Sequence, residues 1–178
     1  MVKEIISWAK AILAALVLVF ICRQFLFLPV TVSGESMDPT LKDGDRIFVS
    51  KISEVERFDT IVFNSPDSDE YYIKRVIGLP GDEISVEDDT LSINGKEYEE
   101  SYLEESKSHL QLGEKFTGDF TLEELTGSRA VPEGEYFVMG DNRLNSNDSR
   151  IFGFIEESEV IGEAEFRFFP FRTISVLH

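Results

Sequence analysis

One serine has neighbours that would suit a nucleophile. Ser36 lies in residues 34–41, GESMDPTL, where a glycine precedes it by two positions and a proline follows it by three. Glycine and proline favour a sharp turn, which can present a hydroxyl beside free backbone N–H groups. A serine that attacks an amide needs a base for its proton and donors for the oxyanion. An ordinary loop serine shows the same pattern, so this segment alone leaves both interpretations open.

A candidate base lies in residues 71–82, YYIKRVIGLPGD. If this segment begins as a strand, Tyr72, Lys74 and Val76 share one face, which places an aromatic and a β-branched side chain beside the ammonium. Lysine is a base only when neutral, and lowering its pKa from about 10.4 to about 7 requires ~4–5 kcal/mol. Burial can supply such a shift. A solvated lysine on a half-exposed strand is the alternative, because Arg75 makes the other face polar as well.

A third segment, residues 140–153 with the sequence GDNRLNSNDSRIFG, is dense in Asp, Asn, Ser and Arg. Such a composition predicts a rigid, hydrogen-bonded loop, in which Asp141 can pair with Arg143 and Asp148 with Arg150. The segment is not an EF-hand, because an arginine stands at a ligand position and a serine replaces the required glycine. A solvated loop without a function is the alternative.

Composition argues against several other chemistries. The chain has 17 Lys and Arg against 34 Asp and Glu, and this net charge of -17 argues against a nucleic-acid partner. The single cysteine, Cys22, excludes a disulfide or a cysteine zinc site within the chain. The two histidines, His109 and His178, have no partner at metal-ligand spacing. We therefore expect hydrolysis without a cysteine nucleophile or a histidine base, and without a metal or other cofactor.

The N-terminal region predicts a membrane anchor over residues 6–28. Residues 11–22, AILAALVLVFIC, form an uninterrupted apolar run, and a spanning helix requires about 20 mostly apolar residues. A cleaved secretory signal is one alternative, although Arg23 and the second apolar cluster after it do not match the usual end of the apolar region in such a signal. A buried helix of a soluble core is the other alternative.

Charge predicts the orientation of this anchor. Lys3 lies before the span and Lys10 near its N-terminal end, whereas acidic residues follow the span. Under the positive-inside rule, residues 1–5 are cytoplasmic, the span crosses the plasma membrane once, and residues 30–178 are extracellular.

Beyond residue 30, short β-rich segments alternate with turn signals. The predicted strands are residues 45–51, 60–65, 71–78, 90–95 and 135–140. Asn94-Gly95 is a strong hairpin turn signal, and only residues 101–110 and 121–127 resemble helices. The predicted fold class is mainly β, preceded by one transmembrane helix. The acidic, weakly patterned residues 97–129 predict an excursion, either a small lobe or a mobile loop.

Together, the three polar segments resemble the type I signal peptidase (leader peptidase) family of bacteria, in its compact single-anchor form. The matches are S-M-x-P-T at residues 36–40, K-R-V-I-G-L-P-G-D at 74–82 and G-D-N-R-x-x-S-x-D-S-R at 140–150. They follow the N-terminal span in the order of that family. The resemblance implies an antiparallel β-sheet catalytic domain over residues 30–178, with a variable insertion or small lobe around 83–131.

The resemblance also implies a serine endopeptidase that removes signal peptides from secretory preproteins, cutting after small residues at positions -1 and -3. Ser36 would attack the scissile carbonyl, neutral Lys74 would take its proton, and Ser146 would orient the lysine. The residues implied to hold the site together are Asp141, Arg143, Asp148 and Arg150.

The oxyanion donors are only partly implied. The Ser36 backbone N–H would be one donor. Many members of the family carry a serine two residues before the nucleophile, where this chain has Gly34. The second donor is therefore open, with a backbone N–H at Gly34 or the side chain of Ser33 as candidates.

The implied partners are signal peptides and the lipid bilayer, with no nucleic acid. Four aromatic residues near the C-terminus could contact lipid, although a final core strand is the favoured interpretation. They are Phe166, Phe168, Phe169 and Phe171. A self-cleaving Ser/Lys protease of the repressor type is a second enzyme hypothesis, disfavoured by the span and the third segment. A catalytically inactive scaffold for surface-protein assembly is a third, disfavoured because both Ser36 and Lys74 are present.

Overall fold

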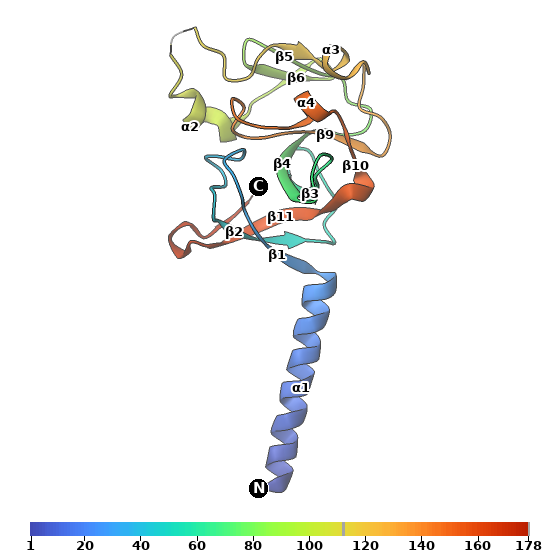
Figure 1. Cartoon of the computed structure of the whole chain (residues 1–178), viewed down its shortest axis with the longest axis vertical. Coiled ribbons are helices and arrows are strands. Elements are labelled where there is room, and N and C mark those ends of the chain that lie inside the picture. Colours follow the sequence, from blue (N-terminus) through green and yellow to red (C-terminus); the bar gives the residue numbers. More distant parts are fainter. Residues whose placement is uncertain (112, 178) are drawn as a thin grey trace.

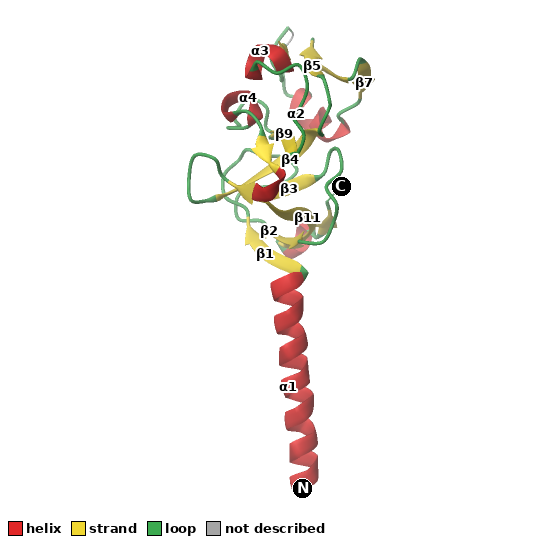
Figure 2. Cartoon of the chain, turned by 90° about the vertical axis from the view of Figure 1, so that its right-hand side faces the viewer, coloured by secondary structure: helices red, strands yellow, loops and turns green. Residues whose placement is uncertain are grey.

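A helix followed by a β-rich body forms the chain (Figures 1 and 2). The structure is a computed structural model that describes residues 1–111 and 113–177, and the side chains of residues 2–3 and 21–25 are outside this description. The predictions that concern His178 and the side chains of Lys3, Cys22 and Arg23 therefore fall outside the described residues.

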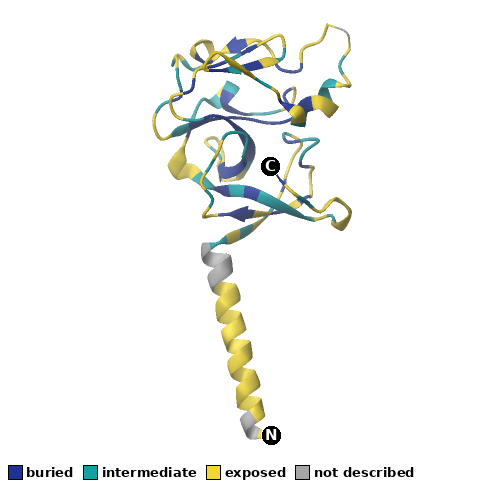
Figure 3. Ribbon diagram, turned by 180° about the vertical axis from the view of Figure 1, so that it is seen from behind, coloured by how far each residue is buried: buried dark blue, intermediate teal, exposed yellow. Residues whose placement is uncertain are grey.

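Helix α1 (Val2–Phe25) extends away from the body and is exposed along residues 4–20 (Figure 3). It ends before β1 (Phe27–Thr31), whose backbone pairs with the neighbouring strand. The helix thus ends three residues before the end of the predicted span of 6–28, and Phe27 and Leu28 belong to a sheet. Among the helices in the described part of the chain, none is both long enough and apolar enough to cross a bilayer.

The larger sheet is antiparallel throughout and forms the centre of the body. Its strands after β1 are β2 (Arg46–Ser50), β3 (Thr60–Asn64), β4 (Tyr71–Gly78), β9 (Glu135–Met139), β10 (Ile155–Glu156), β11 (Val160–Phe169) and β12 (Ser175–Val176). The order is β1-β2-β11-β3-β4-β9-β10, and β12 pairs with β11. The predictions of strands at β2, β3, β4 and β9 are confirmed, and so is the mainly antiparallel β class.

A second antiparallel sheet lies within residues 83–131, which we call the small lobe. Its strands are β5 (Ile84–Glu87), β6 (Thr90–Ile93), β7 (Lys96–Tyr98) and β8 (Phe120–Thr121), in the order β7-β6-β5-β8. Asn94 and Gly95 turn β6 into β7 with φ of 54° and 75°, which confirms the predicted hairpin turn. The small lobe and α1 lie at opposite ends of the molecule (Figure 1).

Short helices complete the body. They are η1 (Ser101–Leu103), α2 (Glu104–Lys107), α3 (Leu122–Thr126), α4 (Ser149–Phe152), η2 (Glu157–Glu159) and η3 (Phe171–Thr173). The two helix-like segments of the sequence, 101–110 and 121–127, contain η1 with α2 and α3 respectively.

The C-terminal aromatic residues lie on β11 and η3 and are not core residues. Phe166 and Phe168 are half-buried, and Phe169 and Phe171 are exposed. The expected final strand is present, but the expectation that it is a core strand is wrong for these side chains. Phe168 instead stacks on Phe48 of β2, with ring centres 4.4 Å apart.

Two clusters of buried apolar side chains place the segments that carry chemistry. One contains Met37 and Leu41 together with residues of β2, β3 and β4, and it anchors the turn after β1. The other joins Phe137 and Met139 of β9 to the small lobe. The small lobe therefore packs on the strand that leads directly into residues 140–150.

Candidate active site

Ser36 lies in a turn whose flanking residues are fixed in the core. Met37 and Leu41 are fully buried, and the Leu41 N–H donates to the Met37 carbonyl oxygen at 2.9 Å. Gly34 has a φ of 85°, a conformation that glycine adopts without steric cost. The turn thereby presents the half-buried Ser36 at the surface of the body.

Lys74 comes from the middle of β4 and reaches Ser36. Its Nζ atom donates to the Ser36 Oγ atom at 2.8 Å, although the two residues are 38 positions apart in the chain. The same Nζ atom donates to the Ile73 carbonyl oxygen at 3.1 Å and lies 5.0 Å from the centre of the Tyr72 ring. Lys74 is only 4% exposed. The structure therefore brings together the two side chains that the sequence proposes as nucleophile and base.

Burial changes the acidity of Lys74. It lowers the pKa of the ammonium from 10.5 to about 8, while the carboxylates of Asp148, Asp141 and Asp67 act in the opposite direction. A lysine with this pKa loses its proton near neutral pH far more readily than a solvated lysine. The neutral amine can then accept the proton of a neighbouring hydroxyl.

A groove of about 480 Å³ opens beside these two side chains. Residues 30–37 and 69–74 line it, together with Asn145 and Asn147. In the described sheet, β1 is an edge strand, and the pairing of β4 with β9 begins only at Arg75. Both walls thus offer backbone groups that an extended peptide can pair with.

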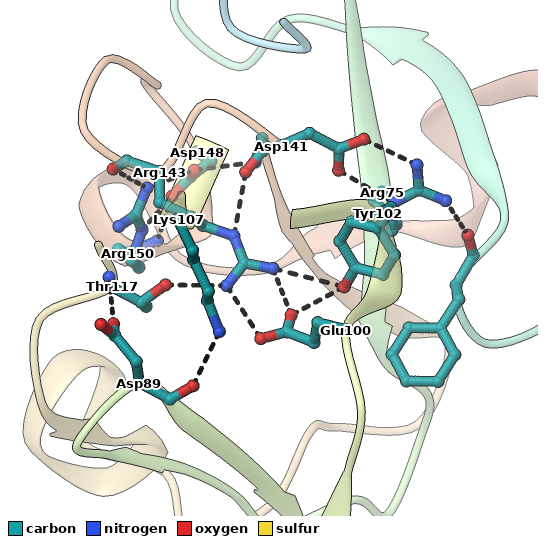
Figure 4. Close-up of polar contacts among 12 residues, drawn as sticks. Arg75, Asp89, Glu100, Tyr102, Lys107, Thr117, Asp141, Arg143, Asp148 and Arg150 are labelled. Atoms are coloured by element: carbon teal, nitrogen blue, oxygen red, sulfur yellow. Dashed lines mark hydrogen bonds and ion pairs between the residues drawn. The ribbon is translucent and has the colours of Figure 1, made fainter. Parts of the chain in front are cut away.

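Buried ion pairs hold the loop of residues 140–150 (Figure 4). Asp148 accepts hydrogen bonds from Nε and a terminal nitrogen of Arg150, both at 2.8 Å, so the predicted pair is present. Asp148 also accepts the Gly140 N–H at 2.9 Å. This carboxylate therefore fixes both ends of the loop.

The predicted pair between Asp141 and Arg143 is wrong, because each side chain has a different partner. Asp141 accepts two hydrogen bonds from Arg75, at 2.9 and 2.6 Å. The register of β4 with β9 places Arg75 opposite Met139, close to the start of the loop. Arg143 pairs instead with Glu100 of the small lobe. Arg75 and Glu100 were not predicted as site residues, since no local pattern distinguishes Glu100 from the other acidic residues around it.

Ser146 does not form the predicted hydrogen bond with Lys74. Its buried Oγ atom has no hydrogen-bond partner among the described residues. The side chain packs closely against Gly140, where an added Cβ would lie 2.2 Å from the Ser146 Oγ atom. This close packing places Ser146 at the site without a hydrogen bond to the lysine.

The candidate oxyanion donors differ in their partners. The Gly34 N–H donates to the Asp43 Oδ1 atom at 2.9 Å. Ser33 lines the groove beside Ser36. The Asn142 N–H donates to the Ser36 carbonyl oxygen at 2.9 Å and so fixes the backbone of the nucleophile. Within residues 1–111 and 113–177, no group of three His, Cys, Asp or Glu side chains is arranged to bind a metal.

A hydroxyl in contact with a buried amine, beside a groove that an extended peptide can occupy, is the arrangement expected of a serine peptidase of the Ser/Lys type. The chain belongs to the signal peptidase family, peptidase S26, whose pattern it matches over residues 5–169. Signal peptidase IB of Staphylococcus aureus (strain COL) is 44% identical over 179 residues, covering 96% of this chain and 93% of the relative. Signal peptidase I of Bacillus licheniformis is 47% identical over 178 residues, covering 97% of this chain and 92% of the relative.

A solved structure agrees with this assignment. The crystal structure of a signal peptidase I from Enterococcus faecalis V583 has a TM-score of 0.61 and 49% sequence identity. The match covers 63% of this chain and 97% of that chain. The resemblance noted from the three polar segments is therefore confirmed.

Proposed function

We propose that this signal peptidase removes signal peptides from secretory preproteins through an acyl-enzyme, with Ser36 as nucleophile and Lys74 as general base. The observation that carries the proposal is the 2.8 Å contact between the Lys74 Nζ and Ser36 Oγ atoms. Neutral Lys74 accepts the hydroxyl proton as the Ser36 oxygen attacks the scissile carbonyl. The resulting ammonium donates a proton to the leaving amine. The neutral lysine then deprotonates the water that hydrolyses the acyl-enzyme ester.

The lining of the groove supports cleavage after small residues at positions -1 and -3. Alternate side chains of an extended peptide point to the same side, so these two residues face the same wall. Val32, Met37 and Ile73 line the groove and are themselves buried. These side chains give the wall an apolar surface, which suits small apolar side chains at both positions.

Two donors are proposed for the oxyanion. They are the Ser36 backbone N–H and the Ser33 hydroxyl, because Ser33 lines the groove. The Gly34 N–H is the less suitable candidate, since it donates to the Asp43 carboxylate. Donors aimed at the developing negative charge lower the barrier most when they are free of other partners.

We assign supporting roles to the polar loop. Asp141, Arg143, Asp148 and Arg150 position residues 140–150 through their ion pairs. Ser146 is the proposed support for Lys74. Its Oγ atom forms no hydrogen bond among the described residues but lies close enough to Asp148 to lower the pKa of that carboxyl, and we propose that it turns to the amine during catalysis.

Helix α1 is the proposed membrane anchor, with the N-terminus in the cytoplasm and residues 30–178 outside the cell. Its 24 residues extend about 36 Å, against about 30 Å for a hydrocarbon core. Apolar side chains such as Leu13 and Phe20 are more than half exposed and therefore lack a protein partner. Resistance of the protein to alkaline extraction from membranes would support this role, and release of the whole protein would refute it.

Cleavage of a preprotein by the purified chain in detergent tests the enzymatic proposal. Sequencing the new N-terminus of the product identifies the bond that is cut. Ser36→Ala should be folded and inactive, because it removes the hydroxyl that attacks the carbonyl. Lys74→Arg should be folded and inactive as well, because a guanidinium stays protonated and cannot act as a base. The exposed controls Ser158→Ala and Lys42→Arg should remain active. A wild-type chain that cuts no preprotein would favour the inactive-scaffold alternative, and an active Ser36→Ala variant would refute the assigned nucleophile.

A further inference from the structure

Glu100 of the small lobe is a carboxylate buried beside the loop of residues 140–150, which we call the catalytic loop. Its side chain is 2% exposed and forms an ion pair with Arg143, whose side chain is 1% exposed. The Tyr102 hydroxyl donates to the same carboxylate at 2.7 Å, and Thr117 accepts a hydrogen bond from Arg143 at 3.0 Å. Figure 4 shows these side chains converging on the guanidinium of Arg143. A buried charge at this depth requires its partner, because removal of either one leaves the other uncompensated.

The Arg143 side chain links Glu100 to the backbone around Ser36. Its Nε atom donates to the Gly140 carbonyl oxygen at 3.0 Å. The Asn142 N–H, in the same loop, donates to the Ser36 carbonyl oxygen at 2.9 Å. The pair of Glu100 with Arg143 therefore stabilises the segment that fixes the position of the nucleophile.

Tyr102 makes the corresponding contact to the strand of the base. The guanidinium carbon of Arg75 lies 4.0 Å from the centre of the Tyr102 ring, a cation–π contact. Arg75 directly follows Lys74 in β4, so its side chain leaves the opposite face of the strand. Its donors are directed to Asp141 and to the Phe58 carbonyl oxygen. Tyr102 thus covers the guanidinium that ties β4 to the catalytic loop.

The four buried charges of this network balance. Arg75 and Arg143 carry two positive charges, and Asp141 and Glu100 carry two negative charges. Without the Glu100 charge, Asp141 is the remaining carboxylate in this set, and both arginines are attracted to it. Arg143 would then compete with Arg75 for Asp141, and the loop would shift relative to β4.

We infer that Glu100 and Tyr102 are positioning residues for the Ser36–Lys74 pair, so that the small lobe is part of the catalytic machinery. The inference rests on the proposed function. Glu100 acts by holding Arg143 against the loop, and Tyr102 acts by holding Arg75 against Asp141. Neither side chain is among the residues that line the groove, so both act on catalysis rather than on substrate binding.

Glu100→Gln tests this inference, and Glu99→Gln is the matched control. Both variants remove one negative charge from adjacent positions, but Glu99 is exposed. kcat and KM are measured on a preprotein-derived peptide, well below the melting temperature and with folding verified by circular dichroism. Glu100→Gln should lower kcat by about 10-fold to 100-fold with KM largely unchanged, since a misplacement of about 1 Å costs that much. Glu99→Gln should match the wild type.

A Glu100→Gln variant that is folded and has the wild-type kcat would overturn the inference and leave Glu100 a structural residue only. A rise in KM without a change in kcat would overturn it as well. Failure of the proposed function is separately visible, because the wild type would then cut no preprotein or Ser36→Ala would remain active.

If Glu100→Gln does not fold, a second pair of variants tests the positioning role of the small lobe. Tyr102→Phe keeps the ring over Arg75 and loses the hydroxyl hydrogen bonds with Glu100 and Arg143, whereas Tyr102→Leu loses the ring contact as well. kcat should be lower for Tyr102→Leu than for Tyr102→Phe, with KM similar in both. Equal, wild-type kcat values in the two variants would overturn the inference.

Discussion

Gly140 provides a sharp test of how closely the active site is packed. A Cβ added at this position would lie 2.2 Å from the Ser146 Oγ atom and 2.4 Å from the Ser36 carbonyl oxygen. Rotation of the serine hydroxyl does not remove the clash, because the Ser146 Cβ atom would lie 2.7 Å from the new methyl group. The Ser36 carbonyl oxygen belongs to the backbone and accepts the Asn142 N–H at 2.9 Å, so it cannot turn away either.

The size of the effect of Gly140→Ala follows from this geometry. Non-bonded carbon contacts are ordinarily about 3.5 Å or longer, so the Ser36 carbonyl or the loop must move by about 1 Å. Overpacking of this kind lowers the free energy of unfolding by about 1–3 kcal/mol. A displacement of about 1 Å at the nucleophile lowers the rate by about 10²-fold. We therefore expect a folded protein with a kcat/KM reduced by about that factor.

The assay measures kcat/KM on a preprotein-derived peptide and the free energy of unfolding in urea. Gly118→Ala is the matched control, because a Cβ at Gly118 would meet no atom within 4 Å. Neither glycine has a positive φ between +20° and +160°, so the two substitutions differ in crowding and not in backbone strain. Gly118→Ala should retain wild-type activity.

Wild-type activity in Gly140→Ala would refute the reasoning, since the Ser36 backbone would then tolerate the displacement or would not be displaced. Equal losses in Gly140→Ala and Gly118→Ala would also refute it, because crowding would not explain them.

Three further predictions concern the acidity of Lys74. Because burial lowers its pKa from 10.5 to about 8, kcat/KM should rise with pH through a midpoint near that value, whereas a midpoint near 10.5 would contradict the assignment of a buried base. Between about pH 8 and 10.5, the unfolded chain retains a proton that the folded chain has lost, so this group should raise the free energy of unfolding by about 3 kcal/mol as pH increases across that window. Below that window the folded chain bears the full cost of a buried charge, so inactive Lys74→Met should be more stable than the wild type near neutral pH by a similar amount. Urea unfolding of both proteins at neutral and alkaline pH checks this, and an identical pH dependence in the two would contradict it.

Local sequence patterns were sufficient for much of the fold. Alternating β-rich segments predicted β2, β3, β4 and β9, and two residues with a strong turn preference predicted the β6–β7 hairpin. The long strand β11 was predicted only as a final strand, with burial in the core as the favoured interpretation. It pairs with both β2 and β3, and its register shifts interrupt the period-two pattern that reveals a strand.

The residue types of the active site could also be predicted from the sequence, because a nucleophile, a base and a polar loop each have a recognisable local composition. Their contacts could not. The Ser36–Lys74 hydrogen bond joins residues 38 positions apart, and the lowered pKa of Lys74 results from burial that several strands create together.

The ion pairs show most clearly which contacts could be predicted from the sequence and which could not. Within residues 140–150, the Asp148–Arg150 pair spans two positions and was predicted, whereas Arg143 pairs with a residue 43 positions away. The sequence by itself determined which charged groups are available and which short segments form strands. Tertiary structure decided which charges meet, because strand register and the packing of the small lobe bring distant side chains into one buried volume, where each charge requires a partner.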